Sequence, residues 1–98
     1  MKESNLISVI IPTLNQGSQI TVLLDKLIGQ SLSPAEIIVV DSQSDDGTPA
    51  LVSQYIANHT GQNIRFIGIE RKDFDHGATR DMALRESNGD FVLFLTQD

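Results

Sequence analysis

The chain has 98 residues, which allows at most one domain, and its formal net charge of −6 disfavours nucleic acid and anionic lipid as partners. It contains no cysteine, which excludes disulfides and thiolate metal sites and is typical of a reducing compartment such as the cytoplasm. Residues 1–5 lack the apolar stretch of an export signal, and no apolar run approaches the roughly 20 residues that span a bilayer. We therefore expect a cytoplasmic protein.

Four short apolar runs are expected to form strands, at residues 7–11, 36–40, 64–69 and 91–95. Three of them are nearly continuous and rich in β-branched or aromatic residues, the pattern of strands covered on both faces in a parallel sheet. The run at 64–69 partly alternates between apolar and polar residues, so we expect it at the edge of the sheet.

Three helical segments are expected between these strands. Residues 18–30 place apolar side chains on one stripe at helical spacing. The second helix, 48–58, is expected to begin with Thr48 as the N-cap and Pro49 at the first helical position. The third is expected from about 78 to 87.

The alternation of strands and helices predicts an α/β fold, a Rossmann-like three-layer α/β/α arrangement around a parallel sheet with right-handed crossovers. We find no internal repeat and no linker, so residues 1–98 are expected to form a single unit. In open parallel sheets, ligands bind at the carboxyl ends of the strands near a topological switch point. The loops that follow the strands are therefore the candidate ligand-binding segments.

The loops after the first two strands carry polar residues at this rim. Pro12 has no N–H to donate to the sheet, so we expect it to end the first strand. Thr13 and Asn15 follow, and their alternative role is a plain turn into a helix capped by Asn15 or Ser18. Asp41 is the first polar residue after the second strand, where a carboxylate can accept hydrogen bonds from a base or a ribose. The residues after it are also typical of a simple turn.

The later loops suggest a phosphate and a metal. Arg80, near a helix N-terminus, would attract a phosphate, or would instead pair with a neighbouring carboxylate. Thr96 and Asp98 are two apart after the fourth strand and point to the same side of an extended chain, where their oxygens suit Mg²⁺ or Mn²⁺. A metal between Asp98 and a diphosphate, with Arg80 opposite, would offset the repulsion between the acidic rim and the phosphates.

Taken together, these segments resemble the start of the family 2 glycosyltransferases, which have the GT-A fold. The similar segments occur in the family's order and cover almost the whole chain: 7–15, 36–42, 44–48, 77–83 and the closing strand. The resemblance implies a nucleotide-diphospho-sugar donor, dTDP- or UDP-linked. It also implies transfer of the sugar, usually with inversion, to a glycan or lipid-linked acceptor.

The resemblance also implies roles for individual residues. The nucleotide-binding residues would be Pro12, Thr13, Asn15, Asp41, Ser42 and Arg80. Asp41 would contact the base and Arg80 would lie near the diphosphate. Asp98 would be the last carboxylate of the family's Asp-x-Asp motif, which holds Mn²⁺ or Mg²⁺, and Thr96 stands where the first usually is. No catalytic residue is expected here, because the general base of the family lies downstream of this motif.

Two positions depart from the common family pattern. Leu14 stands where many members carry an aromatic residue that stacks on the base. The sequence at 96–98, together with 74–80, is similar to a branch that contains bacterial rhamnosyltransferases. This likeness implies rhamnose as the donor sugar and a role in cell-surface polysaccharide biosynthesis.

We interpret the 98 residues as the donor-binding part of a longer inverting glycosyltransferase that is inactive without its acceptor-binding part. The longer protein is expected in the cytoplasm, either free or peripheral to the inner face of the membrane. A chain that lacks the acceptor-binding part would expose an apolar surface and an open sheet edge, so we expect it to self-associate.

One alternative is a non-catalytic α/β interaction module that keeps the fold but has lost donor binding. The substitutions at Leu14 and Thr96 allow it, whereas the presence of Asp41, Arg80 and Asp98 together argues against it.

A second alternative is a receiver-type signalling domain with Asp41 as the phosphate acceptor. Such domains carry an acidic pair after the first strand, where this chain has Pro12, Thr13, Leu14 and Asn15. They also have a fifth strand with a lysine, which this sequence lacks.

Overall fold

The computed structural model describes residues 7–29, 34–70, 76–88 and 91–95, without the side chains of 76–80. Its elements, in chain order, are β1 (Ile7–Thr13), α1 (Gln19–Ile28), β2 (Glu36–Asp41), α2 (Thr48–Asn58), β3 (Ile64–Gly68), α3 (His76–Glu86) and β4 (Phe91–Phe94). The predicted alternation of four strands and three helices is confirmed. In the part of the chain that is described, no helix is long and apolar enough to cross a membrane.

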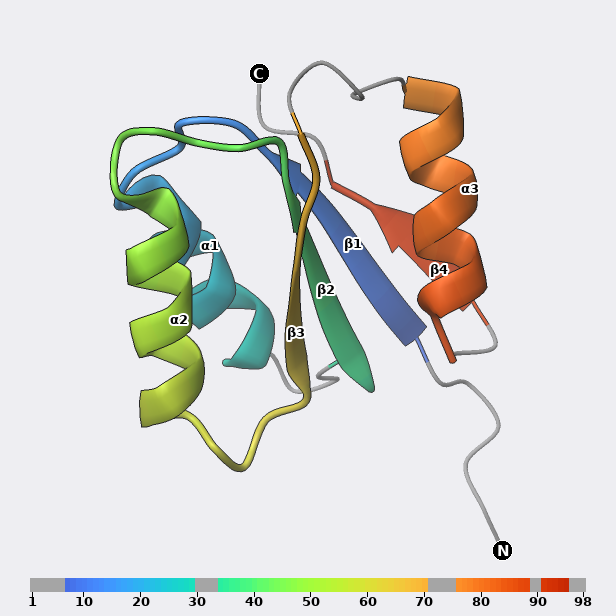
Figure 1. The fold of residues 1–98 in the computed structure, drawn as a ribbon. Coiled ribbons are helices and arrows are strands. Elements are labelled where there is room, and N and C mark those ends of the chain that lie inside the picture. The colour runs from blue at the N-terminus through green and yellow to red at the C-terminus, as the bar shows by residue number, and fades with distance from the viewer. Residues whose placement is uncertain (1–6, 30–33, 71–75, 89–90, 96–98) are drawn as a thin grey trace, which may run out of the picture.

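The four strands form one parallel sheet in the order β3-β2-β1-β4 (Figure 1). The chain builds outward from β1 to β2 and β3, and then crosses back to add β4 on the other side of β1. The strand order therefore reverses between β1 and β4, which makes this the topological switch point. The prediction that the third strand lies at an edge of the sheet is confirmed.

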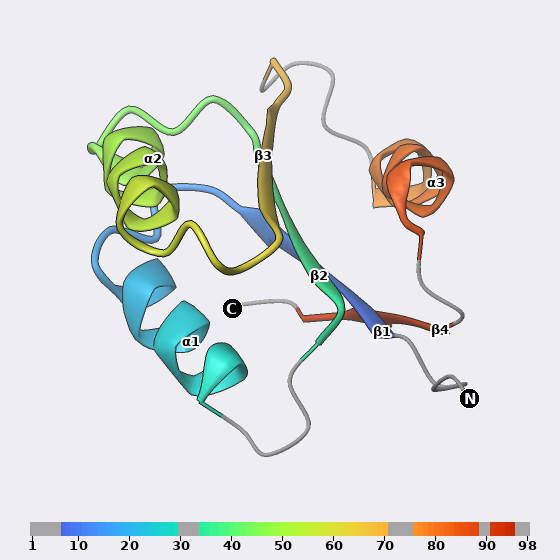
Figure 2. The same cartoon turned by 90° about the horizontal axis from the view of Figure 1, so that it is seen from below.

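Helices cover both faces of the sheet, with α1 and α2 on one face and α3 on the other (Figure 2). Because side chains alternate along a strand, each inner strand contributes to both faces. The core under α1 and α2 is built from Val9, Ile11, Ile20, Leu24, Leu27, Ile37, Val39, Val52, Tyr55 and Ile64. The core on the α3 face is smaller and contains Ile10, Ile38, Val40 and Ala83. Burying each large aliphatic side chain stabilises the fold by roughly 1.5–3 kcal/mol.

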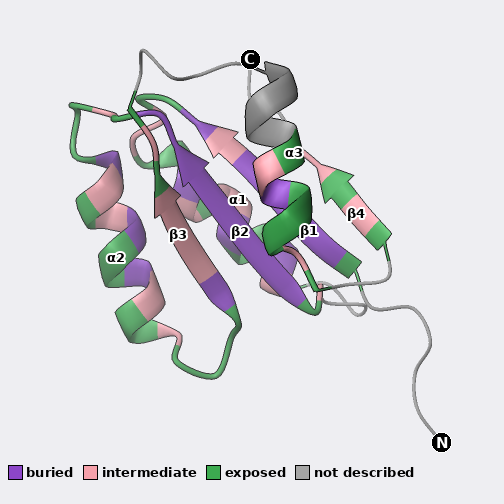
Figure 3. Cartoon of the chain, turned by 45° about the vertical axis from the view of Figure 1, so that its right-hand side comes forward, coloured by how far each residue is buried: buried purple, intermediate pink, exposed green. Residues whose placement is uncertain are grey.

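The β4 edge of the sheet is less covered than its centre (Figure 3). Phe91 is 58% exposed and Leu93 is 49% exposed, whereas β2 is buried along its whole length. Ile7, which pairs with Phe91 in the register, is 38% exposed. These residues form an apolar surface at one edge of the sheet.

The prediction that Pro12 ends the first strand is wrong, because β1 continues through it to Thr13. The carbonyl of Ile10 accepts the N–H of Leu95 at 3.0 Å, whereas the carbonyl of Thr13 accepts the N–H of Ser42 at 3.0 Å on the β2 side. Alternate residues of a parallel strand face the same neighbour, so Pro12 faces the β4 side. The β1–β4 pairing ends at Ile10 in the described part of the chain, so the missing N–H of Pro12 costs no ladder hydrogen bond.

The predicted start of α2 is wrong by one residue. Gly47, at φ 94°, is the N-cap, and Thr48 is already helical. Glycine adopts this left-handed conformation without the steric cost of a Cβ. Ser18 holds the N-cap position of α1 but its side chain makes no capping hydrogen bond. Neither predicted side chain, Asn15 or Ser18, therefore caps the first helix. Asn15 instead bonds Ser44 and Asp45 in the loop after β2.

Glu36 ties the amino end of the sheet to α3. Its carboxylate is 3% exposed and accepts a hydrogen bond from Ser8 Oγ at 2.6 Å and another from the backbone N–H of Asn88. Arg65 lies 4.0 Å from Glu36 Oε1 and pairs more closely, at 2.7 Å, with Glu86. One buried carboxylate thus links β1, β2 and the segment after α3, with β3 beside it.

Candidate functional site

Thr13 and Asp41 meet at the carboxyl ends of β1 and β2. They are direct partners in the parallel register, and both are buried, at 3% and 1% exposure. Each is the last residue of its strand and the first polar residue after an apolar run. The sheet therefore carries a carboxylate and a hydroxyl to the rim on which the loops after β1 and β2 lie (Figure 1).

The Asp41 carboxylate is held by three hydrogen bonds. Its Oδ1 accepts from Thr13 Oγ1 at 2.8 Å and from Ser44 Oγ at 2.6 Å. Its Oδ2 accepts from the Ser44 backbone N–H at 2.8 Å. Burial of a charged group is costly unless it is hydrogen-bonded, and these donors compensate that cost. They also fix the orientation of the carboxylate.

Asn15 joins the loop after β1 to the loop after β2. Its backbone N–H donates to Ser44 Oγ at 2.7 Å, and its side-chain Oδ1 accepts the N–H of Asp45 at 2.9 Å. Asn15 has φ 55°, a left-handed conformation that asparagine tolerates better than most residues. The Ser44 hydroxyl accepts the Asn15 N–H and donates to Asp41, so it connects the loop after β1 with the Asp41 carboxylate.

A second link between the loops lies at the start of α2. Thr48 Oγ1 accepts the N–H of Gly17 at 2.9 Å and donates to Asp46 Oδ1 at 2.5 Å. The same Asp46 oxygen accepts the Thr48 N–H at 3.1 Å. The hydrogen bond from the Thr48 hydroxyl is the main cause that lowers the pKa of Asp46 below the usual aspartate range.

The structure brings together only some of the predicted site residues. Thr13, Asp41 and Ser42 lie side by side, with the Ser42 N–H on the Thr13 carbonyl at 3.0 Å. Asn15 is exposed in the loop just described, and Pro12 is half-buried in β1. Arg80 belongs to α3, which covers the face of the sheet opposite α1 and α2 (Figure 2). Its side chain is not among those that the structure describes.

Thr96 and Asp98 lie outside the described residues. The N–H of Leu95 bonds the carbonyl of Ile10, so the described chain leaves β4 beside β1, at the switch point. Within the described ranges, no three His, Cys, Asp or Glu side chains gather in a way that would hold a metal ion.

Ser44 is the residue at this rim that sequence reasoning missed. It provides two of the three donors to Asp41, yet it reads as part of an ordinary Ser- and Asp-rich turn. The sequence did contain a signal for this contact, because aspartate side chains in turns frequently accept the backbone N–H of a residue a few positions later. Ser44 stands three positions after Asp41.

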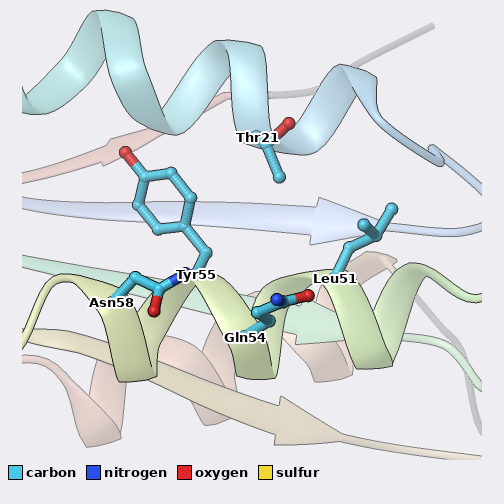
Figure 4. A pocket seen from close by; sticks show the side chains of 5 residues that line it. All are labelled: Thr21, Leu51, Gln54, Tyr55 and Asn58. Carbon is cyan, nitrogen blue, oxygen red and sulfur yellow. The ribbon is translucent and has the colours of Figure 1, made fainter.

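A pocket of about 150 Å³ lies elsewhere, between α1 and α2 (Figure 4). It is lined by Thr21, Leu51, Gln54, Tyr55 and Asn58. These residues belong to the outer helices and not to the loops at the strand ends, so this pocket is separate from the rim that holds Asp41.

Comparison with known proteins adds a family, relatives and solved structures. Residues 8–98 match the model of the family described as Glycosyl transferase family 2. The O-antigen chain rhamnosyltransferase RfbN of Salmonella typhimurium is 41% identical over 93 residues, which are 94% of this chain and 28% of that protein.

Among solved structures, mannosyltransferase PcManGT from Pyrobaculum calidifontis, in complex with GDP-Man and Mn²⁺, matches with a TM-score of 0.84 and 29% identity. The match covers 96% of this chain and 28% of that one. TarS residues 1–349 from S. aureus match with a TM-score of 0.77 and 35% identity, over 93% of this chain and 27% of that one. The chain thus spans less than a third of each of these proteins.

Proposed function

The chain belongs to glycosyl transferase family 2, and from this premise we propose that it is the donor-binding part of an inverting glycosyltransferase. Its four-stranded parallel sheet and flanking helices are those of the GT-A glycosyltransferases that it resembles in structure. The family match over residues 8–98 favours this function over a non-catalytic interaction module and over a receiver domain.

The observation that carries the proposal is the fixed carboxylate of Asp41 at the rim next to the switch point. Open α/β sheets bind nucleotides at this place. The carboxylate is held by Thr13 and Ser44 and can accept an N–H from a base. Preorganised acceptors of this kind bind a ligand without the cost of ordering the side chain first.

The other nucleotide contacts follow from position in the fold. Pro12, Thr13 and Ser42 would line the nucleotide pocket, and Asn15 would hold the loop that shapes it. Leu14 is 42% exposed in the same loop and offers the base an apolar side chain in place of an aromatic ring. Arg80, in the first half of α3, would supply positive charge to the diphosphate.

Thr96 and Asp98 would hold the divalent metal, Mn²⁺ or Mg²⁺. A carboxylate and a hydroxyl are hard oxygen donors, which are the ligand types that these ions prefer, so the residues fit the ion. When bound, the metal would neutralise charge on the diphosphate of the donor.

The donor sugar that we propose is rhamnose from a dTDP-linked donor, with a UDP-linked donor as the other pyrimidine nucleotide. The identity of 41% with an O-antigen chain rhamnosyltransferase supports this choice. The acceptor would be a glycan or a lipid-linked glycan. The base that deprotonates the acceptor hydroxyl would lie in the part of the relatives that this chain does not span.

Self-association of the chain and its location are part of the proposal. The exposed Ile7, Phe91 and Leu93 at the β4 edge support association through this surface. The cysteine-free sequence supports a reducing compartment, and we place the longer protein in the cytoplasm at the inner face of the membrane.

Calorimetric titration of the 98-residue chain with dTDP and UDP tests the donor site, first with Mn²⁺ and then with EDTA. We expect binding with Mn²⁺, and weaker binding with EDTA and for the Asp98→Asn variant. We also expect no sugar transfer by this chain alone. The absence of any nucleotide binding, or sugar transfer without the remaining part of the relatives, would contradict the proposal.

A further inference from the structure

The way in which Ser44 binds Asp41 limits what a ligand can do at this carboxylate. Ser44 spans both oxygens, since its hydroxyl donates to Oδ1 at 2.6 Å and its backbone N–H donates to Oδ2 at 2.8 Å. Thr13 Oγ1 adds a second hydrogen bond to Oδ1 at 2.8 Å. An ionised carboxylate offers about four acceptor positions, two on each oxygen. The described residues fill both positions on Oδ1 and one on Oδ2.

One acceptor position therefore remains, on Oδ2. A ligand with a single N–H can add to it without displacing Ser44. A ligand with two adjacent N–H groups needs one acceptor position on each oxygen. Oδ2 has such a position, but both positions on Oδ1 are filled, by Ser44 and Thr13. Such a ligand would have to displace Ser44 or Thr13 from Oδ1, or leave one donor unpaired in a buried position, which sites of this kind discriminate against strongly.

The nucleobases differ in this respect. Uracil and thymine present one imide N–H between two carbonyl oxygens. Guanine presents a ring N–H beside an amino group, so it offers two adjacent donors. Adenine presents an amino group beside a ring-nitrogen lone pair, and this lone pair would face the electron density of the carboxylate.

We propose that Ser44 and Thr13 determine the base specificity of this site by leaving Asp41 a single acceptor position, and that the site therefore selects uracil or thymine nucleotides over guanine nucleotides. The inference rests on the proposed function, because it assumes that Asp41 is the residue that contacts the base. It names the two residues that restrict the site to the pyrimidine nucleotides of the proposed donors and exclude guanine.

The hydrogen bonds between the loops after β1 and β2 support this selection. The Ser44 hydroxyl also accepts the Asn15 N–H at 2.7 Å, and Asn15 in turn accepts the Asp45 N–H at 2.9 Å. Displacing Ser44 from Asp41 would therefore disturb the contact between both loops. A guanine nucleotide that displaced the Ser44 hydroxyl would therefore disturb the Asn15 contact as well, and one that displaced Thr13 would leave a buried hydroxyl without its acceptor.

Competitive calorimetric titration of the 98-residue chain with UDP, dTDP, GDP and ADP, all with Mn²⁺, tests the inference. We expect UDP and dTDP to bind about tenfold or more tightly than GDP and ADP. Ser44→Ala and Thr13→Val each free a position on Oδ1, so each should reduce the ratio of GDP to UDP dissociation constants by a factor of about three or more. Ser53→Ala, on the exposed side of α2, is the matched control and should leave this ratio unchanged.

The outcomes separate this inference from the function on which it rests. Binding of GDP within about threefold of UDP by the unaltered chain would overturn the inference and leave the donor site intact. If folded Ser44→Ala and Thr13→Val chains keep the same ratio of GDP to UDP dissociation constants as the unaltered chain, the inference is also overturned and the donor site is not. Failure to bind any of the four nucleotides would contradict the donor site, and the inference with it.

Discussion

Asp46 caps α2 through its side chain although it lies two residues before the helix begins. Its Oδ1 accepts both the N–H and the hydroxyl of Thr48, the first helical residue. The first N–H groups of a helix have no partner within it, so an aspartate here satisfies a donor that would otherwise be left free. Gly47 then supplies the left-handed backbone that brings the chain into the helix.

The Asp46 interaction predicts a change in stability at acidic pH. The Thr48 hydroxyl lowers the pKa of Asp46 in the folded protein, so the stabilisation is present above the ordinary aspartate pKa of about 3.9. It is lost as the pH falls through the lower pKa of the folded state. We expect Asp46→Ala to reduce the melting temperature at pH 7 and to reduce it less at pH 2.

Thermal denaturation followed by circular dichroism from pH 2 to pH 7 measures this difference. Asp81→Ala is a suitable control, since it removes an exposed carboxylate on α3, away from the start of α2. If the melting temperatures of Asp46→Ala and the unaltered chain differ by the same amount at pH 2 and at pH 7, the assignment of Asp46 as the cap is wrong.

At the scale of elements, a buried phenol joins α1 to α2. Tyr55 on α2 is 7% exposed, and its hydroxyl donates to Asp25 Oδ1 on α1 at 2.6 Å. Figure 4 shows the ring reaching from α2 towards α1. His59 stacks on the ring with centroids 3.9 Å apart. Burial first, and then the hydrogen bond to Asp25, raise the pKa of Tyr55.

We expect Tyr55→Phe to lower the free energy of unfolding by about 1–2 kcal/mol, because it removes one hydrogen bond and leaves Asp25 without its donor. The raised pKa means that the contribution of the hydroxyl is fully present below the ordinary tyrosine pKa of about 10 and is lost as the pH rises towards the folded value. The difference between the two proteins should therefore shrink in strong alkali.

Urea denaturation at pH 7 and above pH 10 measures the effect. Asp25→Asn, which keeps an acceptor oxygen, should cost less than Tyr55→Phe at pH 7. Equal stability of the Tyr55→Phe variant and the unaltered chain at pH 7 would show that the bond does not hold the two helices together.

At the scale of the whole molecule, the sheet has its candidate site at one end and a structural polar network at the other. Glu36 holds the amino end, where it bonds Ser8 and the segment after α3. Its Oε1 has no hydrogen-bond partner among the described residues, and Arg65 is the nearest cation. The position of α3 on the sheet depends on this buried carboxylate as well as on the small core around Ile38.

We expect Glu36→Ala to destabilise the fold by about 2–4 kcal/mol, because it removes the acceptor of two hydrogen bonds, from the Ser8 hydroxyl and from the Asn88 N–H, at a buried position. The matched control is Glu86→Ala, which removes an exposed ion pair to Arg65 and should cost less than about 1 kcal/mol. Urea denaturation measures both. A cost for Glu36→Ala no larger than that for Glu86→Ala would mean that the network does not anchor α3.

The fold could be predicted from the sequence because its signals are local. The apolar runs, the helical stripe of Ile20, Leu24 and Leu27, and the Pro49 start signal all lie within short windows, and each predicted element is confirmed. The errors occurred where a neighbour in space decides the outcome. Pro12 stays in its strand because it faces the β4 side, where the described pairing ends at Ile10.

The site could be predicted only in part, for the same reason. Asp41 and Thr13 are visible as polar residues at strand ends, but their contact depends on β1 and β2 being neighbours in parallel register. The links from Ser44 to Asn15 and from Thr48 to Gly17 each join residues about 30 positions apart, and no periodicity in the sequence reveals them. The roles of Arg80, Thr96 and Asp98 stay predictions.

The most direct test of the central claim, that Asp41 is the base acceptor of a nucleotide-sugar site, is calorimetric titration of Asp41→Asn with UDP and dTDP in Mn²⁺. Asp25→Asn is the control, because it makes the same change of charge far from the strand ends, and thermal denaturation establishes that both variants fold. We predict that the unaltered chain and Asp25→Asn bind alike and that folded Asp41→Asn binds at least about tenfold more weakly. Undiminished nucleotide binding by Asp41→Asn would contradict it.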